Sequence, residues 1–322
     1  MNPEFPVLPF RTMLYTPEEL FAGFRTDDPA SYGATVDLVT YRSTRLTASR
    51  EVGMLRALHD QCISDARDDL LAGRRVVAVM GGHALARTDP AYADVVALAA
   101  ALTARGDLVV SGGGPGAMEA THLGALLAGV GAARRADALA HLASAPGFPE
   151  GGPPLVGVDG VLDPVALAAL HAWQRPAFEV LEGVAVTDRG ESLAIPTWFY
   201  GHEPPTPFAT HIAKYFSNSL REDGLLAVAG DGIVFAPGWA GTVQEIFQDA
   251  TQNVYRVFHD RFSPMVFLDT GGAWTHQLPV LPLLRTLFGD DDYDRYVCCT
   301  DDPATALSFL AGIAAGAGST PG

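Results

Sequence analysis

The spacing of the hydrophobic residues changes about a quarter of the way along the chain. From residue 74 onward, short uninterrupted apolar runs alternate with amphipathic stretches, as in RRVVAVM at 74–80 and GIVFA at 232–236. Apolar runs of this length are typical of strands buried on both faces of a parallel sheet. Residues 74–316 are therefore predicted to form an α/β domain, with a doubly wound, mostly parallel sheet flanked by helices.

The first two strand–helix units both contain a glycine-rich turn. The run at 74–80 ends in Gly81-Gly82, and Asp89-Pro90 then opens a helix that extends through Arg105. The next strand, turn and helix follow in GDLVVSGGGPGAMEATHLGALLAG at 106–129. Because right-handed crossovers join parallel strands, both glycine turns are expected at the carboxyl edge of one sheet, where doubly wound folds bind ligands.

Residues 1–73 are predicted to be an extension that packs on this domain. Thr16 followed by Pro17 indicates the start of a helix, and the segment 34–42 is interpreted as a strand. The segment 50–71 has helical periodicity, with one apolar stripe expected to be covered by the sheet or by a sister subunit. That stripe consists of Met54, Leu55, Leu58, Cys62, Ile63, Ala66 and Leu70.

A helical insertion is predicted at 131–190, and a frayed tail at 317–322. The insertion combines a short helix near 132–145, a Pro/Gly loop, and a longer helical pattern that Pro176 is expected to interrupt. The tail, AGSTPG, lacks any apolar periodicity.

The sheet is predicted to resume with a strand at 193–199. The loop HEPPTP at 202–207 is expected to run over the carboxyl edge of the sheet, near the glycine turns, because its prolines disfavour a helix or a central strand. A helix from about residue 207 then carries Lys214 and Arg221. Further elements are a strand at 264–270, a helix at 274–288, a strand at 293–300 and a closing helix at 302–315.

Composition narrows the classes of partner. The chain of 322 residues has a formal net charge of −16, which argues against nucleic acid or an anionic membrane as a partner. No membrane span and no signal peptide are recognised, so a cytoplasmic location is expected. The three cysteines show no metal-ligand spacing, and Cys298 and Cys299 are interpreted as small core residues. No metal or cofactor is predicted.

The stretch DGIVFAPGWAGTVQEIFQDAT at 231–251 carries the first candidate site. A strand, a turn at Pro237-Gly238 and a helix beginning near Gly241-Thr242 would aim free helix amides at a phosphate. Glu245 stands three residues after Thr242, so the two also fit a capping box, in which the glutamate would have a structural role.

The second candidate site is the glycine turn at 112–116, GGGPG. A dinucleotide-binding fingerprint has a different spacing and lies on the first strand of its unit, so a nicotinamide cofactor is not predicted. Four glycines in five residues do allow a backbone to approach a ligand closely. Ligand binding is the favoured interpretation, and a tight turn is the alternative.

Together, SGGGPGAMEA at 111–120 and PGWAGTVQE at 237–245 resemble the two signatures of the Lonely Guy family, GGGxxG and PGGxGTxxE. The resemblance covers roughly 74–130 and 190–300. It implies a Rossmann-like homodimer that hydrolyses the N-glycosidic bond of a nucleoside 5′-monophosphate, giving free base and ribose 5-phosphate. It also implies that Glu245 is the catalytic carboxylate. The residues expected around the substrate and its phosphate are Gly82, Gly112, Gly113, Gly114, Gly116, Glu119, Pro237, Gly238, Trp239, Gly241 and Thr242.

The chain departs from the family pattern at three positions. Trp239 replaces the second glycine of PGG, Gln244 replaces a frequent acid, and an ungapped alignment puts Ala213 where the family has its catalytic arginine. Lys214 and Arg221 are the candidate replacement cations, although acids follow Arg221 directly, as is typical of a solvated surface. The alternative function is a non-catalytic carrier or sensor of a nucleotide or a phosphorylated cofactor such as a pterin. Another is an interaction protein with a vestigial pocket.

Overall fold

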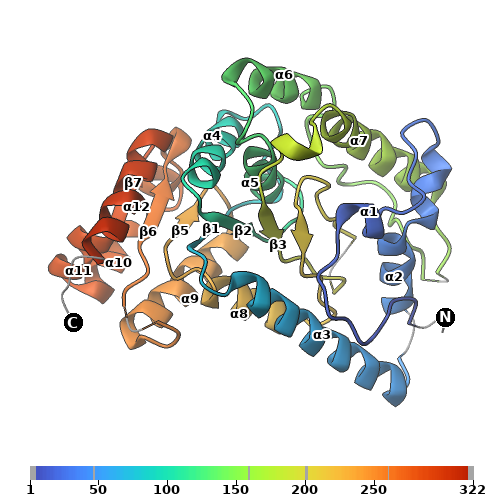
Figure 1. Ribbon diagram of the computed structural model, residues 1–322, viewed down its shortest axis with the longest axis horizontal. Coiled ribbons are helices and arrows are strands. Elements are labelled where there is room, and N and C mark those ends of the chain that lie inside the picture. The colour runs from blue at the N-terminus through green and yellow to red at the C-terminus, as the bar shows by residue number, and fades with distance from the viewer. Residues whose placement is uncertain (1–4, 46–47, 159, 200–201, 260, 318–322) are drawn as a thin grey trace.

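A single parallel sheet forms the centre of the molecule. The computed structural model describes residues 5–45, 48–158, 160–199, 202–259 and 261–317, and within them seven strands pair in the order β4-β3-β2-β1-β5-β6-β7 (Figure 1). Every neighbouring pair is parallel. The strands are β1 Val76–Met80, β2 Leu108–Ser111, β3 Ser192–Ala194, β4 His211–Ile212, β5 Ile233–Phe235, β6 Met265–Leu268 and β7 Val297–Thr300.

Helices cover both faces of this sheet, as Figure 1 shows. Alternate side chains of β1 enter two separate cores, with Val77 and Val79 in one and Val76, Ala78 and Met80 in the other. Helices α4 Pro90–Ala104, α5 Ala117–Leu126 and α12 Pro303–Ala317 lie on the first face, with α6 Ala132–Leu142 and α7 Pro164–Glu182 outside them. The second face carries α3 Arg50–Leu71, α8 Asn218–Ala227, α9 Ala240–Tyr255 and α10 Leu281–Phe288. The predicted Rossmann-like α/β architecture is confirmed.

The strand order reverses at β1. The chain runs outward from β1 through β2, β3 and β4, and then returns to β5 on the other side of β1. Ligands of open α/β sheets bind in the crevice that such a reversal leaves at the carboxyl ends of the strands. The fold therefore places the turns after β1, β2 and β5 side by side.

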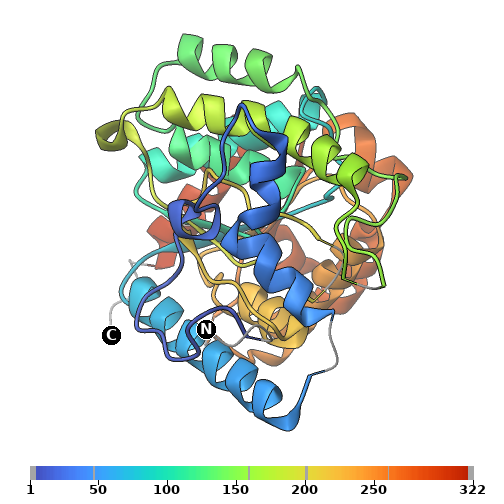
Figure 2. The ribbon, with the colours of Figure 1, turned by 90° about the vertical axis from the view of Figure 1, so that its right-hand side faces the viewer.

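The N-terminal segment lies beside the β4 edge of the sheet, and its helices are in front in Figure 2. Tyr15 exchanges backbone hydrogen bonds with Ile212 of β4, and Thr16 caps the short helix α1 Pro17–Leu20, as predicted. The strand predicted at 34–42 is wrong, because these residues form α2 Val36–Thr44. The Thr35 side chain accepts a hydrogen bond from Leu38 N and starts that helix, which overrides the preference of Val and Thr for strands.

Helix α3 has the predicted bounds, but its buried face is rotated from the predicted stripe. Met54 is 73% exposed and Leu58 42% exposed, whereas His59 and Asp60 are buried. His59 can be buried because its ring nitrogen Nε2 lies 2.8 Å from the Tyr15 hydroxyl, which satisfies its polar group. Asp60 accepts hydrogen bonds from the backbone amides of Phe216 and Ser217. The remaining members of the stripe, Leu55, Cys62, Ile63, Ala66 and Leu70, are buried or partly buried.

The helix predicted from residue 207 is also wrong. His211–Ile212 forms β4, and the helix α8 begins only at Asn218. The segment is a strand instead of a helix because Ile212 pairs with Ala194 of β3 on one side and with Tyr15 on the other. Lys214 therefore follows a strand, and Arg221 lies on the first turn of α8.

Further differences concern helices, a strand and the two neighbouring cysteines elsewhere in the chain. Helix α7 continues through Pro176, with Trp173 and Ala177 buried on either side of it. The helix predicted at 274–288 is divided into a π-helical turn, Ala273–Gln277, and α10, because Pro279 stands between them and Pro282 occupies the first turn of α10. Residues 290–296 form α11 Asp290–Tyr296, and β7 follows as an edge strand. Cys299 is exposed rather than in the core, and Cys298 is partly buried.

The closing helix is confirmed as α12, and of the predicted tail only Ala317, its last residue, is described. Residues 318–322 of that tail lie outside the described part of the chain. No helix in the described ranges has the length and apolarity required to cross a bilayer.

Candidate functional site

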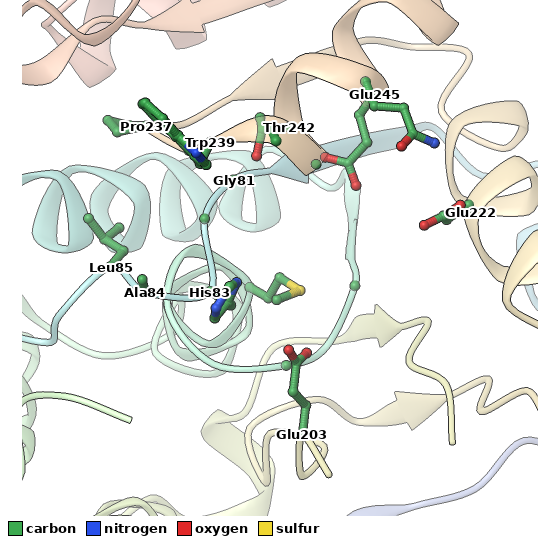
Figure 3. Close-up of a pocket in the computed structure, with 18 of the residues that line it drawn as sticks. Gly81, His83, Ala84, Leu85, Glu203, Glu222, Pro237, Trp239, Thr242 and Glu245 are labelled. Carbon is green, nitrogen blue, oxygen red and sulfur yellow. The ribbon is translucent and has the colours of Figure 1, made fainter. Parts of the chain in front are cut away.

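A cavity of about 650 Å³ opens at the carboxyl edge of the sheet (Figure 3). The turns that follow β1, β2 and β5 form its floor, and the helices α8 and α9 form one wall. Both predicted motifs contribute to it. Its lining residues include Gly82, Gly112, Gly114, Arg221, Pro237, Gly238, Trp239, Gly241, Thr242 and Glu245 from the predicted set, together with His83, Met118, Glu203, Glu222 and Gln244.

The three turns are packed backbone to backbone. Gly82 N donates to Pro237 O at 3.0 Å, and Ala117 N donates to Gly82 O at 3.1 Å. Gly116 has φ +69°, and a Cβ at this position would collide with the carbonyl oxygen atoms of Gly82 and His83. Glycine is therefore required here by both its backbone angle and the close approach of the first turn. Gly113 and Gly116 shape this floor but do not line the cavity.

The N-terminus of α9 faces the cavity without a side-chain cap. The helix begins at Ala240, its N-cap residue is Trp239, and no side chain accepts from its first amides. Thr242 is thus the third helical residue, so the capping box predicted for Thr242 and Glu245 is wrong. The free amides of this first turn and the positive end of the helix dipole favour an anionic group.

Glu245 extends from the second turn of α9 into the cavity, where Figure 3 shows its carboxylate. Burial raises the pKa of Glu245 to about 7, against the opposing effect of the positive charge of Arg221, and Glu222 raises it further. Among the described residues no group donates a hydrogen bond to this carboxylate. It is a half-buried acid that can change its protonation state near neutral pH.

Arg221 supplies a cation to the same cavity. Its guanidinium is 13% exposed, its Nε donates to Ile195 O at 3.1 Å, and a Cβ added to Gly112 would collide with it. It is the one lysine or arginine among the described residues that line the cavity. The interpretation of Arg221 as a solvated surface charge is therefore wrong.

Lys214 lies elsewhere. Its side chain is completely buried, and its Nζ forms an ion pair with Asp37 Oδ1 at 2.5 Å. The same Asp37 oxygen accepts a hydrogen bond from Trp198 Nε1 at 2.8 Å. Burial lowers the pKa of Lys214, and the Asp37 carboxylate partly offsets this effect. Lys214 does not line the cavity, so the structure gives it an ion pair with the N-terminal extension instead of contact with a ligand.

Glu119 is also removed from the cavity. Its two carboxylate oxygens accept from Arg87 at 2.6 and 2.8 Å, and Tyr92 Oη donates to one of them at 2.9 Å. Arg87 in turn lies over the Trp173 ring, 4.3 Å from its centroid. Glu119 therefore connects α5 with α4 and α7, and its expected place beside a ligand is not found.

Four acidic or basic side chains of the cavity were not predicted as site residues from the sequence: His83, Asp89, Glu203 and Glu222. The proline-rich loop that carries Glu203 was correctly expected near the glycine turns, since Thr206 N donates to Gly113 O at 2.8 Å. No periodicity or motif distinguishes Glu222 from a surface acid. In the described ranges no group of His, Cys, Asp and Glu is arranged to hold a metal ion.

Asp249, one turn below Glu245 on α9, gives a prediction about stability. It is 2% exposed, its Oδ2 has no hydrogen-bond partner among the described residues, and burial raises its pKa well above the usual value. A carboxyl group with a raised pKa in the folded state stabilises less as pH rises. Asp249→Asn should therefore increase the free energy of unfolding by about 1–3 kcal/mol near pH 8 and by less near pH 4. Denaturant unfolding at both pH values measures this, and a difference that is independent of pH would contradict it.

No protein-family model and no curated protein matches the chain. A search of solved structures finds, among others, the X-ray structure of TM1055, a structural genomics target. It is similar over 74% of this chain and 99% of its own length, with 18% sequence identity and a TM-score of 0.43.

Proposed function

We propose that the protein is a hydrolase that cleaves the N-glycosidic bond of a nucleoside 5′-monophosphate. The observation that carries this proposal is the pairing of Glu245 with Arg221 in one cavity, beside the uncapped N-terminus of α9. These are a carboxylate, a cation and a phosphate receiver, the three components that the resemblance implies. The proposal includes a homodimer, implied by the resemblance, and the cytoplasmic location expected from the sequence.

The first turn of α9 would receive the phosphate. Gly241 leaves open space around it, and Thr242 is buried with its hydroxyl against Gly238. The amide of Ala117 in α5 is already bonded to Gly82 O, so α9 offers the more accessible set of donors. A phosphate there would place the ribose near the second turn of the helix, where Glu245 is found.

Glu245 and Arg221 would then act on the sugar. As the bond from C1′ to the base nitrogen breaks, positive charge develops on the ribose, and an ionised carboxylate stabilises it. The oxygen of a water molecule forms a bond to C1′. One proton of that water is transferred to the base nitrogen, so that the base leaves neutral and a hydroxyl group remains on C1′. Arg221 favours the ionised form of Glu245 by lowering its pKa, which opposes the effect of burial.

The role of the α9 amides is tested by Ala240→Pro. Ala240 is the first helical residue, a position where proline is tolerated, so the change removes one N–H donor and keeps the helix. We expect the affinity for nucleoside monophosphates to fall by about 10- to 100-fold, as for the loss of a charge-assisted hydrogen bond, with little change for the matching nucleosides. Isothermal calorimetry on both ligand series measures the effect.

Ala132→Pro provides the matched control. Ala132 is the first residue of α6, is also exposed, and lies outside the cavity lining. This variant should bind both series as the unmodified protein does. An equal loss of nucleoside and monophosphate binding in Ala240→Pro would show that the phosphate is not held at this helix.

A further inference from the structure

The cavity has two ends of opposite polarity. The amides of α9 and the Thr242 hydroxyl lie at one end, whereas Glu203 enters from the loop after β3 at the other (Figure 3). Glu203 Oε2 lies 3.1 Å from the position that a Cβ on Gly114 would occupy. A carboxylate therefore stands directly against the glycine turn that the sequence suggested as a phosphate receiver.

The structure holds Glu203 in place from both sides. His202, before it, has a 2% exposed side chain whose Nε2 contacts Tyr32 Oη at 3.3 Å. Three residues after it, Thr206 N donates to Gly113 O at 2.8 Å. The Glu203 carboxylate itself accepts no hydrogen bond from any described residue, so its acceptor capacity is directed into the cavity.

A carboxylate at this position has two chemical consequences. It repels a phosphate from Gly114, whereas the guanidinium of Arg221 stands against Gly112 at the start of the same turn. The uncapped N-terminus of α9 is then the anion-binding end that carries no facing carboxylate from this loop. The Glu203 carboxylate also accepts hydrogen bonds from N–H groups. With the phosphate at α9, the part of a nucleotide that extends toward Glu203 is the base.

We propose that Glu203 is the residue that selects the base, and that the substrates carry a neutral base with N–H donors on its outer edge. This inference rests on the proposed function and adds the substrate class to it. Guanine fits best, because its ring N–H and its amino group are adjacent and match the two oxygens of one carboxylate. Xanthine fits poorly, because it loses a proton near neutral pH and its negative charge would face Glu203.

The test compares the affinities for guanosine and xanthosine monophosphate at pH 8 by isothermal calorimetry. The unmodified protein should bind the guanine nucleotide at least tenfold more tightly. Glu203→Gln, which preserves the shape of the side chain, should reduce this ratio to near one. Glu222→Gln removes the same charge from another wall of the cavity and should leave the ratio unchanged.

Each outcome has a distinct meaning. An unchanged ratio in Glu203→Gln, or an equal fall in both glutamine variants, would overturn the assignment of Glu203 while monophosphate binding itself remained. Failure of the unmodified protein to bind any monophosphate would overturn the proposed function and the base selection together.

Discussion

Replacing Glu245 by glutamine is expected to lower the rate of base release by about 10²- to 10⁴-fold, the range that a positioned acid–base group contributes. The amide has almost the same shape but cannot carry the negative charge that stabilises a cationic ribose. Binding of the monophosphate should change little, because its phosphate is held one turn earlier on α9. Steady-state kinetics and calorimetry on the same variant separate the two effects.

The pH dependence gives the same residue a second test. The pKa of Glu245 is raised to about 7, and the ionised form is the active one in this mechanism. The value of kcat/KM should therefore rise with pH through about 7 and then reach a plateau. A raised carboxyl pKa also means that Glu245 stabilises the fold less as pH increases, so Glu245→Gln should be at least as stable as the unmodified protein above pH 7. A rate that falls over this interval would instead assign the active form to the protonated acid.

The second large effect is expected at Lys214. Lys214→Met removes the partner of Asp37 and leaves a fully buried carboxylate without a counter-charge. Breaking a buried ion pair in this way costs about 3–5 kcal/mol, and Trp198 Nε1 remains as the one neutral donor that the carboxylate is shown to have. Denaturant unfolding should detect the loss, and the activity per folded molecule should be retained.

The double variant Asp37→Asn, Lys214→Met serves as the control. It removes both charges, so most of the lost stability should return, as is common when a buried pair is replaced as a whole. If Lys214→Met instead kept its stability and lost base release, the catalytic interpretation of Lys214 would prevail over the structural one.

The sheet could be predicted because its signal is local. Residues 76–80 and 233–235 are uninterrupted apolar runs, and burial on both faces is what makes them so. The glycine turns could be placed for a similar reason, since the close backbone contacts of Gly116 exclude any larger residue. In these segments the residue pattern of the sequence follows directly from how the residues are packed, so it could be predicted.

The wall that carries Arg221 could not be predicted in this way. Its position depends on Asp60, which is more than 150 residues away and whose carboxylate binds the amides of Phe216 and Ser217 just before α8. The N-terminal extension thus fixes where the helix begins, and no periodicity in 207–221 encodes that contact. The same extension turns Lys214 inward through Asp37.

The most direct test of the proposed function is the analysis of products after incubation with a panel of purine and pyrimidine 5′-monophosphates. The mechanism predicts that free base and ribose 5-phosphate appear in equal amounts with at least one member of the panel, and that Glu245→Gln suppresses both. Tight binding of a monophosphate with no release of base from any member of the panel would contradict catalysis and indicate a carrier or sensor.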